Sequence, residues 1–358
     1  MVAYGNTYDF FGCKSSEFPF ILPFLLNPRL IYDIMYAFGG VGQACERMKR
    51  GVKCMTKLPA KAVFAAIFCN ILFGSAFPMI KLGYEFFGIT ADVFSKILYA
   101  GIRFFIAGII IFIIDSVNRK KISTVGKNNL RNVILLGITY TFLQYIFFYV
   151  GLSNTTGASG SVVNSASAFT AILLAHFIYP DDRLNFKKIA GCVLGFSGVA
   201  LACFSSGEFS GVKFSGEGFI LIAGMFFVVG SVINKKAARY SGSFTVTAYN
   251  LLIGGFLLIV TGLCGYNGEM SVTPEGIFVL LYLVFVSSVG VTLWSTLLKH
   301  YPIGKLSVYN FIIPVSGTLL SGLFLRENIF IWQYMVALLL VSAGILTVNY
   351  VFVRKNKA

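Results

Sequence analysis

Long apolar stretches follow one another along most of this chain, separated by short polar connections. Each stretch is close to the ~20 residues that an α-helix needs to cross ~30 Å of hydrocarbon. Runs such as 109–114 do not alternate between apolar and polar residues, as the strands of a membrane β-barrel would. The pattern predicts an all-α integral membrane fold with ten transmembrane helices. The ten stretches are 62–84, 96–115, 132–153, 160–179, 188–206, 216–235, 245–264, 275–297, 304–324 and 329–353.

The composition agrees with a membrane protein. Of the 358 residues, 57% are hydrophobic and only 12% are charged, whereas soluble proteins carry about 25% charged residues. The seven cysteines form no CxxC pair, so we expect no disulfide framework, no metal site and no cofactor. The net charge of +15 sits in short clusters between apolar runs. Such clusters are typical of topology signals, and we expect no nucleic-acid partner.

The positions of lysine and arginine predict the orientation in the membrane. If the N-terminus is cytoplasmic, the inner connections and the two terminal regions hold 24 of the 29 Lys and Arg residues. The outer connections and their borders hold only Lys96, Lys213 and Arg326. This asymmetry follows the positive-inside rule and predicts an even number of helices with both termini in the cytoplasm. We expect a multi-pass protein of the plasma membrane.

The first residues do not fit the helical pattern. The apolar stretch 18–26 is too short to span a bilayer and contains Pro19 and Pro23. It also lacks the small-residue cleavage site of a signal peptide. We interpret residues 1–58 as a poorly ordered extension, which could reflect a mis-assigned start codon, since Met48 or Met55 offers an alternative start.

The chain contains an internal repeat. A shift of 146 residues places 161–164 (Ser-Val-Val-Asn) on 307–310 (Ser-Val-Tyr-Asn), and Asp181 on Glu327. The aligned stretches are the fourth and ninth, followed by the fifth and tenth, so each half has five helices. Because five is odd, continuous alternation across the membrane inverts the second half. Inverted repeats are typical of secondary transporters, whose substrate sites lie near the midplane between the repeats. We expect a first repeat at 59–206 and a second at 216–353.

Over roughly residues 60–352 the sequence resembles the EamA-type members of the drug/metabolite transporter superfamily. The matching features are 73–81 (Phe-Gly-Ser-Ala-Phe-Pro-Met-Ile-Lys), 102–104 (Ile-Arg-Phe), and Pro314 followed by 325–327 (Leu-Arg-Glu). The first half departs from the family pattern, with Ala168 in place of the usual Pro and Asp181-Asp182 in place of Gly-Glu. The resemblance implies a ten-helix carrier that moves amino acids, related metabolites or drugs, usually outward.

Arg103 is the most informative candidate for substrate binding. It lies about seven residues, or roughly 10 Å, into the stretch 96–115. A charge at that depth costs a few kcal/mol, so Arg103 should face the bundle or a cavity. Its planar fork suits a carboxylate, but a structural tie to backbone carbonyls, or a side chain that reaches the outer membrane surface, explains its presence at least as well. Lys81 is a weaker candidate, because it can pair with Glu85 one turn later.

The remaining candidates are polar and aromatic residues inside apolar stretches. Asn164 and Asn310 are related by the repeat, and either ligand contact or helix packing would satisfy their amides. Aromatic residues with a few polar neighbours would suit amphipathic solutes, but such stripes also serve packing. The full set of predicted substrate-binding residues is Arg103, Lys81, Gln144, Tyr145, Tyr149, Asn164, Trp294 and Asn310.

The motifs of membrane enzymes are missing. The chain contains no HExxH, no GxSxG and no Walker sequence, so we expect no enzyme. No acid lies in the middle of a predicted span, which favours facilitated or exchange transport over a proton antiporter built on a buried glutamate. The expected partners are a small-molecule substrate and membrane lipid, and a homodimer remains open. The alternative functions are a non-transporting membrane subunit and a lipid translocator.

Overall fold

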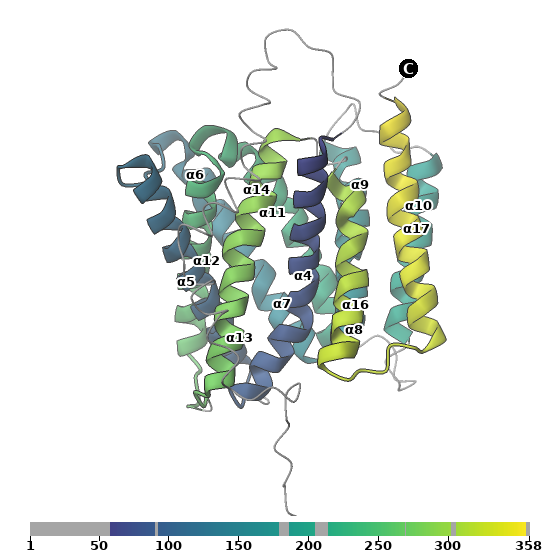
Figure 1. The fold of residues 1–358 in the computed structure, drawn as a ribbon, viewed down its shortest axis with the longest axis horizontal. Helices are drawn as coiled ribbons and strands as arrows, with labels where there is room; N and C mark the ends of the chain where they lie inside the picture. Colours follow the sequence, from purple (N-terminus) through teal and green to yellow (C-terminus); the bar gives the residue numbers. More distant parts are fainter. Residues whose placement is uncertain are drawn as a thin grey trace, which may run out of the picture.

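The computed structural model describes residues 58–89, 92–178, 186–204, 214–268, 270–301 and 306–355, and these residues form helices and no strands. Figure 1 shows the long helices running side by side along one common direction. Apart from its last residue, the predicted extension 1–58 lies outside the described part of the chain. The predicted stretches from 62 onward fall largely within the described residues.

The helices are broken in places by π-helical and 3₁₀ turns. In the first half they are α4 (Ala60–Phe86), α5 (Val93–Arg119), α6 (Lys127–Leu136), the π-helical η2 (Gly137–Leu143), α7 (Gln144–Ser153), α8 (Gly157–Asn164), α9 (Ala166–Ile178) and α10 (Phe186–Phe204). The second half contains the π-helical η3 (Phe214–Gly218), α11 (Phe219–Ser241), α12 (Ser243–Leu263), α13 (Pro274–Phe285), the π-helical η4 (Val286–Gly290), α14 (Val291–His300), the 3₁₀ turn η5 (Ser307–Phe311), α16 (Ile312–Phe324) and α17 (Trp332–Lys355).

Six helical segments in the described part are long and apolar enough to cross a bilayer. They are Ala60–Phe86, Val93–Arg119, Lys127–Ser153, Phe214–Ser241, Ser243–Leu263 and Pro274–His300. Shorter apolar helices cover Lys188–Ala202, Tyr309–Phe324 and Trp332–Val348. A helix satisfies its backbone hydrogen bonds internally, which is what a segment in hydrocarbon requires. The protein is therefore an all-helical, multi-pass membrane protein.

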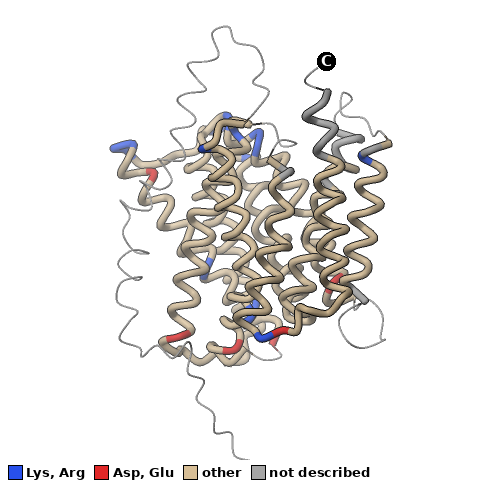
Figure 2. Tube along the Cα trace, turned by 45° about the vertical axis from the view of Figure 1, so that its right-hand side comes forward, with Lys and Arg blue, Asp and Glu red and all other residues tan. Residues whose placement is uncertain are grey.

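The charged side chains separate between the two ends of the bundle. Figure 2 shows most Lys and Arg residues at the end where α17 finishes, and most Asp and Glu residues at the opposite end. We call these the basic end and the acidic end. The middle of the bundle carries few charges, as a hydrocarbon environment demands.

Helices from the predicted stretches that the 146-residue shift pairs, the fourth with the ninth and the fifth with the tenth, also pack against one another. α8 contacts α16, and α10 contacts α17 over most of its length. The repeat-related glycines Gly198 and Gly344 both lie in the second contact, because an added Cβ would come within 2.8 Å of the Ala337 carbonyl or 2.7 Å of the Gly191 carbonyl. Each of these two helix pairs thus contains one helix from each predicted repeat.

The contact between α5 and α12 is the most extensive in the described structure. Glycines allow the two backbones to approach closely. A Cβ added at Gly255 would lie 2.6 Å from the backbone nitrogen of Phe105, and one added at Gly101 would lie 2.6 Å from that of Ile259. Close approach at small residues is how membrane helices gain packing energy, since lipid is as apolar as their side chains.

Asp115 joins the same two helices at the basic end. Its Oδ1 accepts a hydrogen bond from Arg119 Nε at 2.7 Å, and Oδ2 accepts from Ser123 Oγ at 2.5 Å and from Thr245 Oγ1 at 2.6 Å. At the other end of α5, Asp92 caps the helix through Phe94 N and Ser95 N. Although partial desolvation opposes it, the hydrogen bonds from Ser95 and Phe94 hold the pKa of the Asp92 carboxyl below its ordinary value.

We predict that Gly255→Ala destabilises the protein, because the new methyl group meets backbone atoms of α5 that cannot rotate away. The free energy of unfolding should fall by about 1–3 kcal/mol, measured by unfolding in detergent. Gly126→Ala is the matched control, since nothing lies within 4 Å of its added Cβ, and it should cost less than about 1 kcal/mol. An equal loss in the two variants would contradict the close packing of α5 and α12.

Candidate functional site

Arg103 lies inside the bundle, as its depth in an apolar stretch predicts, with only 3% of its surface exposed. Its Nε donates hydrogen bonds to the Leu283 carbonyl at 3.1 Å and to Ser287 Oγ at 2.9 Å. Nη1 donates to the Tyr149 hydroxyl at 2.8 Å. The guanidinium carbon also lies 4.8 Å from the centre of the Phe104 ring, a distance suited to a cation–π contact.

These partners come from both halves of the chain. Tyr149 is on α7 in the first half, whereas Leu283 is on α13 and Ser287 on η4 in the second. Among the described residues, no carboxylate oxygen lies within 4.0 Å of Arg103, and Nη2 donates no hydrogen bond. A buried guanidinium therefore sits where the two halves meet, held only by neutral acceptors, with one terminal nitrogen left over.

Two π-helical segments flank this site. η2 ends directly before Gln144, the first residue of α7, and η4 contains Ser287. A π-helical segment shifts the side chains that follow it relative to a regular α-helix, and such segments occur frequently at functional sites. They occupy the third and eighth predicted helices, which correspond to one another in the two halves. No pattern in the sequence predicts these two π-helical segments.

Aromatic rings surround Tyr149 on several sides. The ring centres of Tyr145 and Phe104 are 4.1 Å apart, and those of Tyr145 and Tyr149 are 6.1 Å apart. Tyr84 and Tyr99 lie 6.1 Å and 6.4 Å from Tyr149, both centre to centre. The Tyr84 hydroxyl donates to the Tyr149 carbonyl at 3.0 Å. Of the residues predicted from sequence, Arg103, Tyr145 and Tyr149 are thus brought together in one aromatic cluster.

Lys81 does not pair with Glu85 as the sequence suggested. Its Nζ instead donates to the Thr155 carbonyl at 2.5 Å, while Glu85 points outward and is exposed. The carbonyl lies in the turn between α7 and α8, close to where α4 passes. A lysine near the end of a membrane helix can reach such a carbonyl more cheaply than it can enter lipid.

Two carboxylates near this turn were not among the predicted site residues. Glu327 accepts hydrogen bonds from the backbone nitrogens of Gly157 at 2.7 Å and Ala158 at 2.9 Å, at the N-terminus of α8. Glu217 accepts from Thr155 Oγ1 at 2.6 Å and is 2% exposed. Because Glu217 lies close to a connection in the sequence, hydropathy alone suggested a solvated helix end.

The other predicted residues lie elsewhere. Trp294 is buried against Phe73 of α4, with the ring centres 6.4 Å apart in an edge-to-face arrangement. Gln144 Oε1 and Asn310 Oδ1 are buried without a hydrogen-bond partner among the described residues. Asn164 closes α8 and is partly exposed. No contact described here joins these four residues to the cluster around Arg103.

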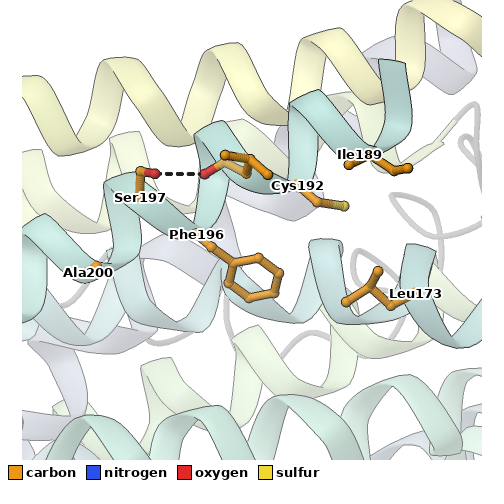
Figure 3. A pocket seen from close by; sticks show the side chains of 7 residues that line it. Leu173, Ile189, Cys192, Phe196, Ser197 and Ala200 are labelled. Atoms are coloured by element: carbon orange, nitrogen blue, oxygen red, sulfur yellow. Dashed lines mark hydrogen bonds between the residues drawn. The ribbon is translucent and has the colours of Figure 1, made fainter. Parts of the chain in front are cut away.

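An apolar groove opens on the outside of the bundle, between α9 and α10 (Figure 3). Its volume is about 520 Å³. The one hydroxyl in its lining, Ser197 Oγ, donates to the Val193 carbonyl of its own helix at 2.8 Å. The lining offers no charged group and suits lipid chains better than a polar solute. It consists of Leu173, Ile189, Cys192, Val193, Phe196, Ser197 and Ala200.

Comparison with known proteins identifies related chains. Residues 60–204 and 214–350 each match the model of the EamA-like transporter family. A "probable amino-acid metabolite efflux pump" of Escherichia coli (strain K12) is 27% identical over 62% of this chain and 77% of its own length. "Uncharacterized transporter YvbV" of Bacillus subtilis (strain 168) is 26% identical over 82% and 94%, respectively.

A solved crystal structure has a similar fold. It superposes with a TM-score of 0.61 at 19% sequence identity and covers 82% of this chain and 98% of its own. The matched family and the two sequence relatives are transporters and not enzymes, and a membrane transporter has a small-molecule substrate and is surrounded by lipid.

We predict that Tyr149→Phe destabilises the protein, because it removes the acceptor of a hydrogen bond from a buried cation. The free energy of unfolding should fall by about 1.5–3 kcal/mol in detergent. Tyr145→Phe is the matched control, because the Tyr145 hydroxyl makes no hydrogen bond to a described residue while its ring lies in the same cluster. If both variants unfold like the wild type, the bond to Arg103 does not hold the cluster together.

Proposed function

The chain belongs to the EamA-like transporter family, and from this premise we propose that it is a secondary transporter that exports amino acids or related small metabolites. The observation that carries this proposal is the buried guanidinium of Arg103, which lies between the two halves without a carboxylate partner among the described residues. A carrier that works by alternating access needs a binding group at such a boundary.

The proposed fold has ten transmembrane helices arranged as two inverted five-helix repeats, at 59–206 and 216–353. The two family matches support it, as do the contacts of α8 with α16 and of α10 with α17. The corresponding π-helical segments η2 and η4 support it as well. In this arrangement the repeats rock against one another about the site, which faces each side of the membrane in turn.

In the proposed mechanism, Arg103 binds the carboxylate of the substrate. The guanidinium has a free Nη2, and the Tyr149 hydroxyl and Ser287 Oγ are neutral acceptors that a carboxylate can replace. A carboxylate adds the attraction of opposite charges and can accept from the guanidinium through two parallel hydrogen bonds, so the exchange is favourable. Because Tyr149 and Ser287 belong to different halves, substrate binding loosens a tie between the halves and lets them move.

The rings around Tyr149 and the unpaired amides supply the other contacts of the proposed site. Tyr145 and Tyr149 offer apolar surface to a side chain. The buried oxygens of Gln144 and Asn310 can each accept a hydrogen bond from a substrate that reaches them. Lys81, Asn164 and Trp294 complete the proposed set, and they lie outside the cluster around Arg103.

We infer the orientation in the plasma membrane from the separation of charge (Figure 2). The basic end, where α4 begins and α17 finishes, faces the cytoplasm in this proposal, and the acidic end faces outward. The N- and C-termini are then both cytoplasmic.

Lipid translocation is the second candidate function, and the groove between α9 and α10 is the observation that favours it. The groove is open to the membrane and apolar. It nevertheless lacks a charged group for a lipid head group, whereas Arg103 lies away from it on α5. Scrambling of labelled phospholipid by the reconstituted protein would support this candidate over the transporter.

We predict that Arg103→Lys lowers amino-acid transport by about tenfold or more, because a lysine cannot reproduce the fork that binds a carboxylate through two nitrogens. The measurement is counterflow of a labelled amino-acid mixture in proteoliposomes. Arg131→Lys, at an exposed position on α6, is the matched control and should leave the flux unchanged. Wild-type flux in a folded Arg103→Lys variant would remove Arg103 from the binding site.

A second prediction concerns the orientation. In a variant without native cysteines, Asn267→Cys at the acidic end should react with a membrane-impermeant maleimide added to intact cells. Lys121→Cys at the basic end should react only after permeabilisation. Both positions are exposed in the structure, so access to the reagent depends on the side of the membrane. The opposite labelling pattern would invert the proposed topology.

A further inference from the structure

Glu217 is a buried carboxylate that is only partly satisfied. It lies in η3, at the start of the helical segment that α11 continues, and is 2% exposed. Its Oε1 accepts a hydrogen bond from Thr155 Oγ1 at 2.6 Å. Its Oε2 is buried and has no hydrogen-bond partner among the described residues. A buried carboxylate oxygen without a donor is costly, so this position favours a ligand that brings one.

Lys81 contacts Thr155, the residue that also hydrogen-bonds Glu217. Its Nζ donates to the carbonyl of Thr155, whereas Glu217 holds the hydroxyl of Thr155. The two opposite charges are therefore bridged by one neutral residue. No oxygen of Glu217 lies within 4.0 Å of Lys81 Nζ, so they form no ion pair.

Glu327 does not complete the arrangement, because it is occupied elsewhere. Both of its oxygens accept backbone N–H groups at the start of α8, from Gly157 and Ala158. The positive end of the helix dipole also stabilises a carboxylate at that position. Glu217 is thus the carboxylate near this turn that retains a free acceptor. Lys81 donates its hydrogen bond to a neutral carbonyl, although Glu327 lies near enough to attract its charge.

A cation and an anion held apart by one residue complement a molecule that carries both charges. We propose that Glu217 binds the protonated amine of a zwitterionic substrate while Lys81 binds its carboxylate, with Thr155 taking the place of the substrate in the empty site. This inference rests on the proposed transport of amino acids. It adds a second station, toward the acidic end, that selects substrates with a free amine.

The second station lies in the turn that follows α7, beyond the part of α7 that contributes Tyr149 to the Arg103 cluster. Thr155 follows Tyr149 by six residues, which is about 9 Å along a helix. On α4, Lys81 lies five residues before Phe86 at the acidic end, whereas Arg103 lies ten residues into α5 from that end. A substrate that leaves Arg103 toward the acidic end would therefore meet Lys81 and Glu217 next. Arg103 recognises only a carboxylate, whereas this station also requires the amine.

The test compares amino acids with their N-acetyl derivatives, which keep the carboxylate and lose the positive charge. Counterflow in proteoliposomes gives the ratio of the two fluxes. We expect the wild type to favour the free amino acids, and Glu217→Gln to lower that ratio by about tenfold or more, because an amide cannot replace a buried carboxylate facing an ammonium group. Glu275→Gln, exposed in the first turn of α13, should keep the wild-type ratio.

Thr155→Val separates recognition from a structural role. It removes the hydroxyl that bonds Glu217 but leaves the carboxylate in place, so it should retain the preference for free amino acids. If Thr155→Val loses the preference as Glu217→Gln does, the contact is only structural and the inference is wrong. Should Glu217→Gln fail to fold, Glu217→Asp is the second variant. It keeps the carboxylate on a side chain one methylene shorter, so it should retain the preference for free amino acids at lower flux.

The outcomes also separate this inference from the proposed function. Amino-acid flux with an unchanged ratio in folded Glu217→Gln overturns the second station and leaves the transporter intact. An equal loss of both fluxes, with the ratio unchanged, also overturns it. Absence of amino-acid flux in the wild type contradicts the proposed substrate class itself, and therefore also the proposed role of Glu217 and Lys81.

Discussion

The hydrogen bonds of Arg103 are the constraint on which the centre of this structure depends. A guanidinium inside hydrocarbon is stable only if the protein supplies acceptors for its donors. Here the acceptors come from α7 in one half and from α13 and η4 in the other. The two halves must therefore meet at Arg103, and the π-helical segment η4 brings Ser287 to the position where it can accept. Both the packing of the two halves and the hydrogen bonds of the guanidinium therefore determine where Arg103 lies.

Around that point, the bundle is held by contacts of two kinds. Glycines let backbones touch, as at Gly101 and Gly255 between α5 and α12. Polar residues close the two ends, with Asp115 at the basic end and the turn around Thr155 at the acidic end. Arg103 is held by hydrogen bonds to neutral acceptors, which a substrate carboxylate could replace in the proposed mechanism. The contact between α5 and α12 is closely packed instead. This division suits a protein whose halves move about a central site.

The sequence was sufficient for the all-helical membrane fold but only for part of the site. Hydropathy located the apolar segments, because hydrocarbon imposes their length and composition. It also placed Arg103 inside the bundle, since a charge at that depth has no favourable alternative. Leu283 and Ser287 could not be predicted as acceptors of Arg103, because they are 180 and 184 residues away along the chain and the π-helical segments carry no recognisable pattern.

Two residues near the acidic end show where reasoning from local sequence fails. Lys81 has Glu85 one turn away, a favourable spacing on an isolated helix, but tertiary packing brings the Thr155 carbonyl closer. Glu217 looked like a solvated residue because it follows a polar connection, yet α7 and α8 cover it. In both cases the deciding partner lies in a turn that is distant in sequence.

The central claim is that the substrate carboxylate binds directly to Arg103. Solid-state magnetic resonance can measure this contact in proteoliposomes that contain nitrogen-labelled arginine and a carboxyl-labelled amino acid. The account predicts a dipolar coupling between the two labels that corresponds to a separation of about 4 Å and that disappears in Arg103→Lys. A bound amino acid whose carboxyl carbon shows no coupling to Arg103 would contradict the account and leave Arg103 as a structural tie between the halves.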